Sequence, residues 1–263
     1  MARRKGGRGG RIPRRHATRH TGRAREPVLM HAAIIAAGHG ERLRPAGLRV
    51  PKPLVEVNGI PLIEHVLQVI SAGGLRKAVC IINEESRAVE DHCRQRIVDL
   101  ELTFVHRTTP NSMESLFTLA PYLGRDPFLL LTVDVIMAPD TLRGFLAAAS
   151  RRDADGVLAV HTFIDDEKPL RVACDREGRI VAIGTSAAGS PLITAGFYLL
   201  RPAMLAERDA ARGAGCAALR DFLAHVVAHG YRLDAEQVPK CVDVDRPEDI
   251  AAAEQFIRSG YRA

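Results

Sequence analysis

From residue 28 onward, short apolar runs alternate with segments whose apolar positions recur every three or four residues. Continuous apolar runs indicate buried strands, and the 3.6-residue period indicates helices with one apolar face. The predicted strands are residues 32–36, 78–82, 102–106 and 128–133, and the predicted helices are residues 61–71, 87–98, a segment from about 112, and 139–149. Strands that alternate with helices in this way are typical of βαβ units, so we predict a mostly parallel sheet.

The pattern changes after residue 155, where predicted strands follow one another without intervening helices. These strands are residues 156–162, 170–174, 179–183 and 192–200, with a hairpin loop at 175–178, and they are followed by helices at 202–211 and 216–228, a strand at 231–237 and a helix after Pro247. We interpret the strand-rich part as a small antiparallel excursion of the same domain. The expected fold is a three-layer α/β/α sandwich, Rossmann-like, with its ligand cleft at the carboxyl ends of the strands.

Composition agrees with one domain and excludes several classes of protein. The 263 residues are 46% apolar and 26% charged, which is ordinary for a globular chain. The longest apolar run, residues 128–137, is broken by Asp134 and is far shorter than the roughly 20 residues that span a bilayer, so we expect no membrane segment. The five cysteines are scattered without a C-x-x-C pair, which favours a reducing, cytoplasmic location and argues against zinc. The sequence leaves a homo-oligomer open.

The net charge of +6 is concentrated at the amino terminus. Residues 1–28 hold ten Arg and Lys against the single acid Glu26, so this segment carries +9 and the remaining chain −3. With few large apolar residues it cannot form a core, and we predict a disordered basic tail at 1–28 and one domain at 29–263. The tail is either a solvated extension or a segment that attracts nucleic acid non-specifically. An organelle transit peptide is a further alternative, although the segment lacks a clear amphipathic period.

The loop after the first strand combines glycines with cationic side chains. Gly38 and Gly40 let the backbone approach a ligand closely, and successive N–H groups in such a turn form a concave site for anions. Arg42 adds a planar guanidinium, and Lys52, between two prolines, adds an ammonium group. This combination suits a triphosphate.

Three aspartates are placed where carboxylates have chemical consequences. Asp134 follows a buried strand, so its carboxylate must be exposed, paired or bound to a metal ion, unless it caps a helix. Asp243 and Asp245 alternate with valines and therefore share one side of a strand. Asp245 could equally be a ligand or the cap of the helix that starts near Pro247.

Together these motifs resemble the signature of the sugar-phosphate nucleotidyltransferase superfamily, which includes NDP-sugar pyrophosphorylases and MobA-like NTP transferases. The resemblance covers residues 31 to about 258. The positions that carry its G-x-G-x-R and P-K-P motifs are Gly38, Gly40, Arg42, Pro45, Pro51, Lys52 and Pro53. Further matches are Asp134 and the D-x-D-x-P-E-D segment that begins at Asp243. The chain departs from the pattern at Gly47, where relatives often have Thr, and at Val133, where they have Gly.

The resemblance implies roles for the nucleotide-binding residues. Ala36 and Ala37 would lie close to the base, and the backbone of residues 37–40, which includes His39, would hold the phosphates. Arg42 would neutralise the departing pyrophosphate, and Lys52 would meet the charge that builds at the α-phosphorus. The further candidates for contact with base and ribose are Asn111 and Ser115, although helix capping explains Asn111 nearly as well.

The resemblance also implies a metal site and an acceptor site. Asp134 with Asp243, and Asp245 as a third candidate, would bind Mg²⁺. The T-A-G-F-Y segment places Thr194 and Gly196 in the acceptor pocket, with Thr194 where relatives have Asn. Lys168 is a candidate for the acceptor phosphate, or else an exposed loop lysine.

The implied activity is Mg²⁺-dependent transfer of a nucleotidyl group from a nucleoside triphosphate to a phosphorylated small molecule, with a sugar 1-phosphate as the first candidate. The alternative acceptors are an alcohol phosphate such as phosphocholine or a cofactor precursor, with CTP or GTP as donor. A non-catalytic nucleotide-binding regulator is the alternative from another class of protein. The sequence does not specify base, acceptor or oligomeric state.

Overall fold

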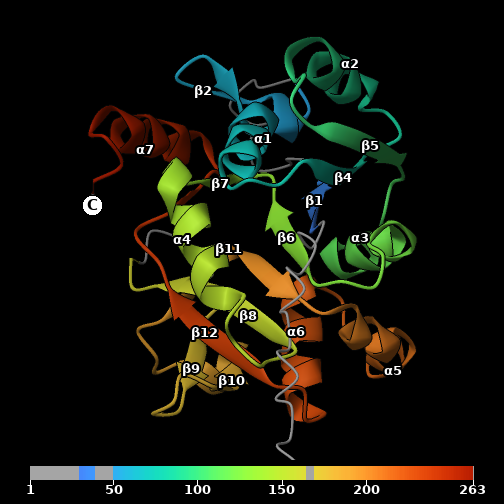
Figure 1. Cartoon of the computed structure of the whole chain (residues 1–263), viewed down its shortest axis with the longest axis vertical. Coiled ribbons are helices and arrows are strands. Elements are labelled where there is room, and N and C mark those ends of the chain that lie inside the picture. Colours follow the sequence, from blue (N-terminus) through green and yellow to red (C-terminus); the bar gives the residue numbers. More distant parts are fainter. Residues whose placement is uncertain (1–29, 39–49, 164–168, 263) are drawn as a thin grey trace, which may run out of the picture.

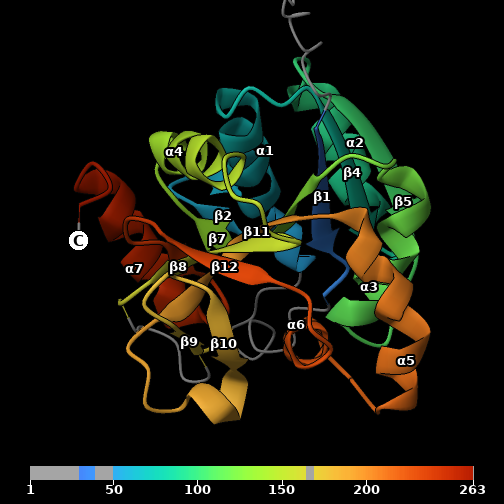
Figure 2. The same cartoon turned by 60° about the horizontal axis from the view of Figure 1, so that its bottom comes forward.

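The computed structural model describes residues 30–38, 50–163 and 169–262. The predicted tail at residues 1–28 lies outside them. The fold is a three-layer α/β/α sandwich, as predicted (Figures 1 and 2). One face of the central sheet is covered by α1 (Leu62–Ala72), α2 (Arg87–Arg96) and α4 (Pro139–Ala149), and the other by α3 (Ser112–Leu119) and α6 (Leu219–Ala228). None of the helices in the described ranges is long and apolar enough to cross a membrane.

The described residues form a seven-stranded sheet in the order β12-β8-β11-β6-β1-β4-β5. Its strands are β1 (His31–Ala36), β4 (Lys77–Ile82), β5 (Glu101–His106), β6 (Phe128–Thr132), β8 (Gly156–His161), β11 (Ile193–Leu200) and β12 (Leu233–Gln237). β11 runs antiparallel to both of its neighbours, and the other neighbouring strands run parallel. The sheet is therefore mostly parallel, as the alternation of strands and helices predicted.

The antiparallel excursion is smaller than the sequence pattern suggested. Of the strands predicted for the excursion, β8 and β11 belong to the main sheet, whereas β9 (Val172–Cys174) and β10 (Ile180–Ile183) form a separate two-stranded ribbon. The predicted hairpin loop joins them, and the Asp175 carboxylate accepts hydrogen bonds from the backbone N–H groups of Glu177 and Arg179. Asp175 thus provides hydrogen-bond acceptors for the backbone N–H groups of the turn, as Asp typically does at such positions.

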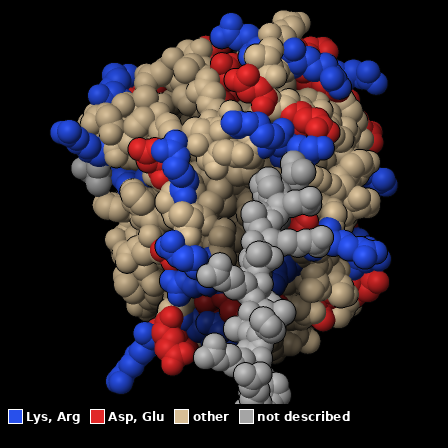
Figure 3. Space-filling view, in the orientation of Figure 1, with Lys and Arg blue, Asp and Glu red and all other residues tan. Residues whose placement is uncertain are grey.

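Several short elements complete the chain. They are β2 (Glu56–Val57) paired with β3 (Ile60–Pro61), β7 (Val135–Ile136) paired with β13 (Val242–Asp243), the 3₁₀ turns Lys52–Leu54, Ala120–Tyr122, Gly184–Ala187 and Pro202–Glu207, and the helices α5 (Arg208–Gly213) and α7 (Pro247–Arg258). The helix predicted at 202–211 thus begins as a 3₁₀ turn, and the one predicted from 216 begins at Leu219. Figure 3 shows that basic and acidic side chains are interspersed over the face seen there.

Apolar side chains pack against both faces of the sheet, and others form one smaller cluster. Ala32 and Ile34 of β1 point toward α1 and α4, whereas Ala33 and Ile35 point toward α3. The smaller cluster, which we call the lateral cluster, consists of Val55, Val57, Leu62, Ile136, Val242, Val244, Ala253 and Phe256. It joins the β2–β3 hairpin, the β7–β13 pair and α7. These are the segments next to the predicted catalytic lysine and aspartates.

Candidate functional site

Lys52, Asp134 and Asp245 meet beyond the carboxyl ends of the sheet strands. Lys52 opens a 3₁₀ turn that the flanking prolines favour, because proline fixes φ near the value this turn needs. Its Nζ donates to Asp134 Oδ2 at 2.6 Å and to Asp245 Oδ1 at 2.5 Å. We call these three residues the ion cluster. It joins positions 82 and 193 residues apart in the sequence.

The ion cluster is charged at neutral pH. The Lys52 side chain is 9% exposed, and its burial alone would lower the pKa of the ammonium. The charges and hydrogen bonds of Asp134 and Asp245 outweigh that effect and raise the pKa of Lys52 above its usual value. For Asp134, burial favours the neutral form, but the charge and hydrogen bond of Lys52 prevail and lower the pKa of the carboxyl. The cluster therefore offers a fixed ammonium beside the ionised carboxylate of Asp134.

The short β7–β13 pair brings the two aspartate segments together. Asp134 lies between β6 and β7, and its carbonyl accepts from the N–H of Val244 at 3.0 Å. Asp243 pairs with Val135 across the ladder. The N-cap of α7 is Arg246 and not Asp245, and Asp249 Oδ2 accepts from the backbone N–H groups of Asp245 and Arg246. Nor does Asp134 cap the following helix, α4, whose N-cap is Ala138.

A cavity of about 180 Å³ opens beside these carboxylates. Its lining includes the predicted acceptor residues Thr194 and Gly196 together with all three predicted metal ligands. The full set is Ser112, Thr132, Asp134, Pro169, Leu170, Ile193, Thr194, Gly196, Tyr198, Ala218, Leu219, Arg220, Asp243 and Asp245. The structure thus brings five of the predicted site residues to one hollow.

Gly196 is required by the backbone and by its surroundings. Its φ of +79° is rarely adopted by residues with a side chain, and the pairing of β11 with β8 shifts register between Thr194 and Tyr198. A Cβ at Gly196 would lie 3.1 Å from Thr132 Oγ1 and 3.5 Å from Asp243 Oδ1. The glycine therefore fits both the positive φ and the close approach of Thr132 Oγ1, and it borders the Asp243 carboxylate.

Tyr198 turns its hydroxyl into the buried part of the same region. The hydroxyl donates to Thr194 Oγ1 at 3.4 Å. Burial, with smaller contributions from the charges of Asp243 and Asp134, raises the pKa of Tyr198 to about 12. Tyr198 is thus a neutral donor at physiological pH and bonds to Thr194, one of the predicted acceptor residues.

The nucleotide side of the predicted site is partly described. Ala36 and Ala37 are buried where the chain leaves β1, and Gly38 is exposed. A Cβ at Gly38 would meet no heavy atom of the described residues within 4 Å, so packing among them does not require glycine there. Close approach of a ligand to the backbone would require glycine at this position. The predicted residues His39, Gly40, Arg42 and Lys168 lie outside the described ranges.

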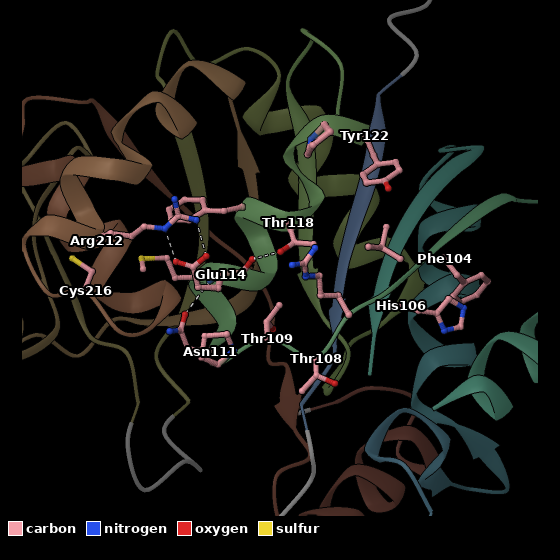
Figure 4. A pocket seen from close by; sticks show the side chains of 16 residues that line it. Phe104, His106, Thr108, Thr109, Asn111, Glu114, Thr118, Tyr122, Arg212 and Cys216 are labelled. Carbon is pink, nitrogen blue, oxygen red and sulfur yellow. Dashed lines mark hydrogen bonds and ion pairs between the residues drawn. The ribbon is translucent and has the colours of Figure 1, made fainter. Parts of the chain in front are cut away.

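Asn111 and Ser115 are occupied in holding their own loop. Asn111 is the N-cap of α3, and its Oδ1 accepts from the N–H of Glu114 at 3.0 Å (Figure 4). Ser115 is buried, and its hydroxyl bonds to Thr109 Oγ1 at 2.6 Å and to the Asn111 carbonyl at 3.3 Å. Asn111 lines a different, larger hollow of about 920 Å³ between β5, α3 and α5. Neither side chain lines the carboxylate cavity.

The sequence analysis missed two residues of this region. Arg220 lines the carboxylate cavity from α6, and Asn83 follows β4 with its amide turned to the Ala37 carbonyl. Single residues of these types carry no motif, so only the topology of the chain could have brought attention to them.

The carboxylates of Asp134, Asp243 and Asp245 are of the chemical type that binds a divalent cation. Within the described ranges, no group of three or more His, Cys, Asp or Glu is arranged to hold a metal ion. The Lys52 ammonium instead lies between Asp134 and Asp245, so a cation already occupies the region where their charges converge. Carboxylate oxygens are the ligands that Mg²⁺ prefers. The donor set therefore fits Mg²⁺ once Lys52 bonds elsewhere.

A family model and individual relatives both identify this chain as an NTP transferase domain. The model of the MobA-like NTP transferase domain matches residues 32–230. A Rubrobacter xylanophilus protein, "Bifunctional IPC transferase and DIPP synthase", is 30% identical over 233 residues, which are 86% of this chain and 51% of that protein. The UTP–glucose-1-phosphate uridylyltransferase AglF of Haloferax volcanii is 26% identical over 238 residues, 87% of this chain and 97% of the relative.

A solved structure extends the likeness to the fold. The inositol-1-phosphate CTP transferase from T. maritima superposes with a TM-score of 0.76 at 21% identity, covering 89% of this chain and 99% of that one. The chain spans about half the length of the Rubrobacter relative. With the family model covering most of the sequence, the chain belongs to the family of MobA-like NTP transferase domains.

Proposed function

We propose that the protein transfers a nucleotidyl group from a nucleoside triphosphate to a phosphorylated small molecule, with a sugar 1-phosphate as the first candidate acceptor. One observation carries the proposal: the Lys52 ammonium and the carboxylates of Asp134 and Asp245 converge beside a cavity that also contains Thr194 and Gly196. Family membership agrees with it.

The reaction needs positioning and charge compensation more than covalent chemistry. An oxygen of the acceptor phosphate attacks the α-phosphorus, the new P–O bond forms, the bond to the β-phosphate oxygen breaks, and pyrophosphate leaves. Lys52 would contribute its ammonium to the charge that develops at the α-phosphate. The 3₁₀ turn fixes the backbone of Lys52 beside the carboxylates, so its ammonium would move only from them to the phosphate when the metal ion binds.

The three aspartates would hold Mg²⁺, with Asp134 and Asp243 as its first ligands and Asp245 as the third. The ion supplies positive charge that offsets the repulsion between the triphosphate and the acceptor phosphate. Removal of divalent cations with EDTA should abolish turnover, and Mg²⁺ should restore it.

Arg220 is our candidate for binding the acceptor phosphate. It lines the cavity from α6, and a guanidinium matches the geometry of phosphate oxygens with two parallel hydrogen bonds. The remaining wall combines the Thr194 and Tyr198 hydroxyls with the apolar side chains of Leu170 and Ile193. A small acceptor with both hydroxyls and C–H surface fits that lining.

The test is pyrophosphate release with Mg²⁺, using ATP, CTP, GTP, UTP and dTTP against glucose 1-phosphate, mannose 1-phosphate and inositol 1-phosphate. Release that requires both substrates, and that Asp134→Asn abolishes, would support nucleotidyl transfer. Tight NTP binding without turnover on any acceptor would instead support the regulatory alternative.

A second candidate is cytidylyl transfer to a phosphorylated alcohol. It is favoured by the likeness to the T. maritima protein, which is named an inositol-1-phosphate CTP transferase. In the same panel it predicts a preference for CTP with inositol 1-phosphate, whereas the first candidate predicts a sugar 1-phosphate as the preferred acceptor.

A further inference from the structure

The amide of Asn83 bridges two loops at the carboxyl edge of the sheet. Its Nδ2 donates to the Ala37 carbonyl at 3.0 Å, and its Oδ1 accepts from the Thr108 hydroxyl at 2.7 Å. A carbonyl oxygen can only accept, so the nitrogen of the amide must face Ala37. Asn83 is 6% exposed, and the Ala37 end of this bridge is buried.

The bond to Ala37 determines where the next N–H group points. The peptide between Ala37 and Gly38 is trans, so its C=O and N–H point in opposite directions. β1 lies between β4 and β6, and Asn83 follows β4. Because the Ala37 carbonyl accepts from Asn83 Nδ2, the Gly38 N–H on the same peptide points away from Asn83.

The other end of the bridge is a loop that further hydrogen bonds hold on both sides of Thr108. The N–H of Arg107 donates to the Ile82 carbonyl at 2.9 Å and continues the β4–β5 ladder by one residue. Farther along, the bonds among Thr109, Asn111 and Ser115 fix the loop to α3. Thr108 lies between these two anchored points (Figure 4). Its hydroxyl therefore offers Asn83 a partner in a fixed position.

We propose that Asn83 is a positioning residue for the nucleotide: by bonding Ala37 and Thr108 it orients the Gly38 N–H toward the triphosphate phosphates. The inference rests on the proposed function for the identity of the ligand. It concerns the nucleotide only, because neither Asn83 nor Thr108 lines the cavity assigned to the acceptor. A ligand can reach this peptide, since Gly38 is exposed and the described residues leave open the space that a Cβ there would fill.

The test compares Asn83→Asp, Thr108→Val and Thr108→Ser with the wild-type enzyme. Asn83→Asp keeps the shape but replaces the donor to Ala37 by an acceptor, and we expect the KM and Kd for the NTP to rise about tenfold, which equals about 1.4 kcal/mol of binding free energy. The acceptor KM should stay within twofold. Thr108→Val should raise the NTP KM about threefold, and Thr108→Ser, which keeps the hydroxyl, should restore it. Asn58→Asp makes the same chemical change in the exposed β2–β3 turn and is the matched control.

The outcomes separate this inference from the proposed function. An NTP KM within twofold of wild type in folded Asn83→Asp would overturn the inference, as would a parallel rise in the acceptor KM. If Asn83→Asp fails to fold, Thr108→Val decides in its place, because Thr108 lies at the surface. If the wild-type protein binds an NTP by calorimetry but releases no pyrophosphate, the function is wrong and the Kd comparison still tests Asn83. If the wild type binds none of the five NTPs, both are overturned.

Discussion

Replacement of Lys52 by methionine separates the catalytic contribution of the ion cluster from its contribution to stability. Methionine keeps most of the buried stem of Lys52 and removes the ammonium. The two carboxylates that lose their partner are 22% and 37% exposed, so water can reach them. Breaking a fully buried pair costs roughly 3–5 kcal/mol, and this access should reduce the loss of unfolding free energy to about 1–2 kcal/mol.

The expected loss of activity is larger. Removing one preorganised donor from a developing negative charge typically costs about 10²–10³ in kcat. We therefore expect Lys52→Met to lower kcat by at least about a hundredfold while the protein remains folded, as measured by pyrophosphate release and by urea unfolding. Lys77→Met is the matched control, because Lys77 pairs with Glu101 at 2.9 Å between two exposed side chains. It should change stability by less than about 1 kcal/mol and leave kcat unaltered. A Lys52→Met enzyme that keeps a kcat within tenfold of wild type would refute this reasoning.

The pH dependence of stability provides a second check on the same cluster. The pKa of Asp134 is lowered on folding, so its contribution is present above the ordinary carboxyl pKa of about 3.9 and is lost as the pH falls through the lowered value. The pKa of Lys52 is raised, so its contribution is present below about 10.4 and is lost as the pH rises through the raised value. Without Lys52, burial alone raises the pKa of Asp134. The stability difference between wild type and Lys52→Met, measured by urea unfolding, should therefore be largest near neutral pH and shrink as the pH falls.

Three further substitutions or modifications have defined outcomes. Gly196→Ala should lower the unfolding free energy by about 1–3 kcal/mol in urea, because φ is +79° and the new Cβ would press on Thr132 Oγ1; unchanged stability would contradict the described backbone. Arg220→Ala should raise the acceptor KM at least tenfold without changing the NTP KM, and an unaltered acceptor KM would remove Arg220 from the acceptor site. Burial, with smaller effects from neighbouring acids, raises the pKa of Cys93 to about 12, so mass spectrometry after iodoacetamide treatment of the native protein should find Cys93 unmodified while the half-buried Cys174 reacts.

Local sequence patterns predicted the parallel part of the sheet well, because each element there has its own periodic signal. The helix at 139–149 has the bounds predicted, with a proline in its first turn and apolar residues at Leu142, Phe145 and Leu146 facing the sheet. The antiparallel direction of β11 agrees with the antiparallel excursion predicted for residues 156–200. Its place inside the main sheet was not predictable from its own residues, because pairing with β6 and β8 decides it.

For the site, the sequence indicated residue types and the structure supplied their partners. Lys52 was assigned to the phosphates, and the described state places it on Asp134 and Asp245. That contact joins segments 82 and 193 residues apart, beyond the reach of any local pattern. β7 and β13 are two residues long and form only because their backbones meet, so no propensity could identify them. Arg220 likewise enters the site only through the placement of α6.

Through the lateral cluster, α7 supports the segments that carry the proposed catalytic residues. Phe256 and Ala253 of α7 pack with Val57 and Val242, next to the segments that carry the ammonium and the carboxylates. If α7 detaches, these segments lose their shared apolar support while the seven-stranded sheet keeps its hydrogen bonds. Amide exchange in α7 and loss of turnover should then occur at the same denaturant concentration, below the concentration that unfolds the sheet. Inactivation would precede unfolding.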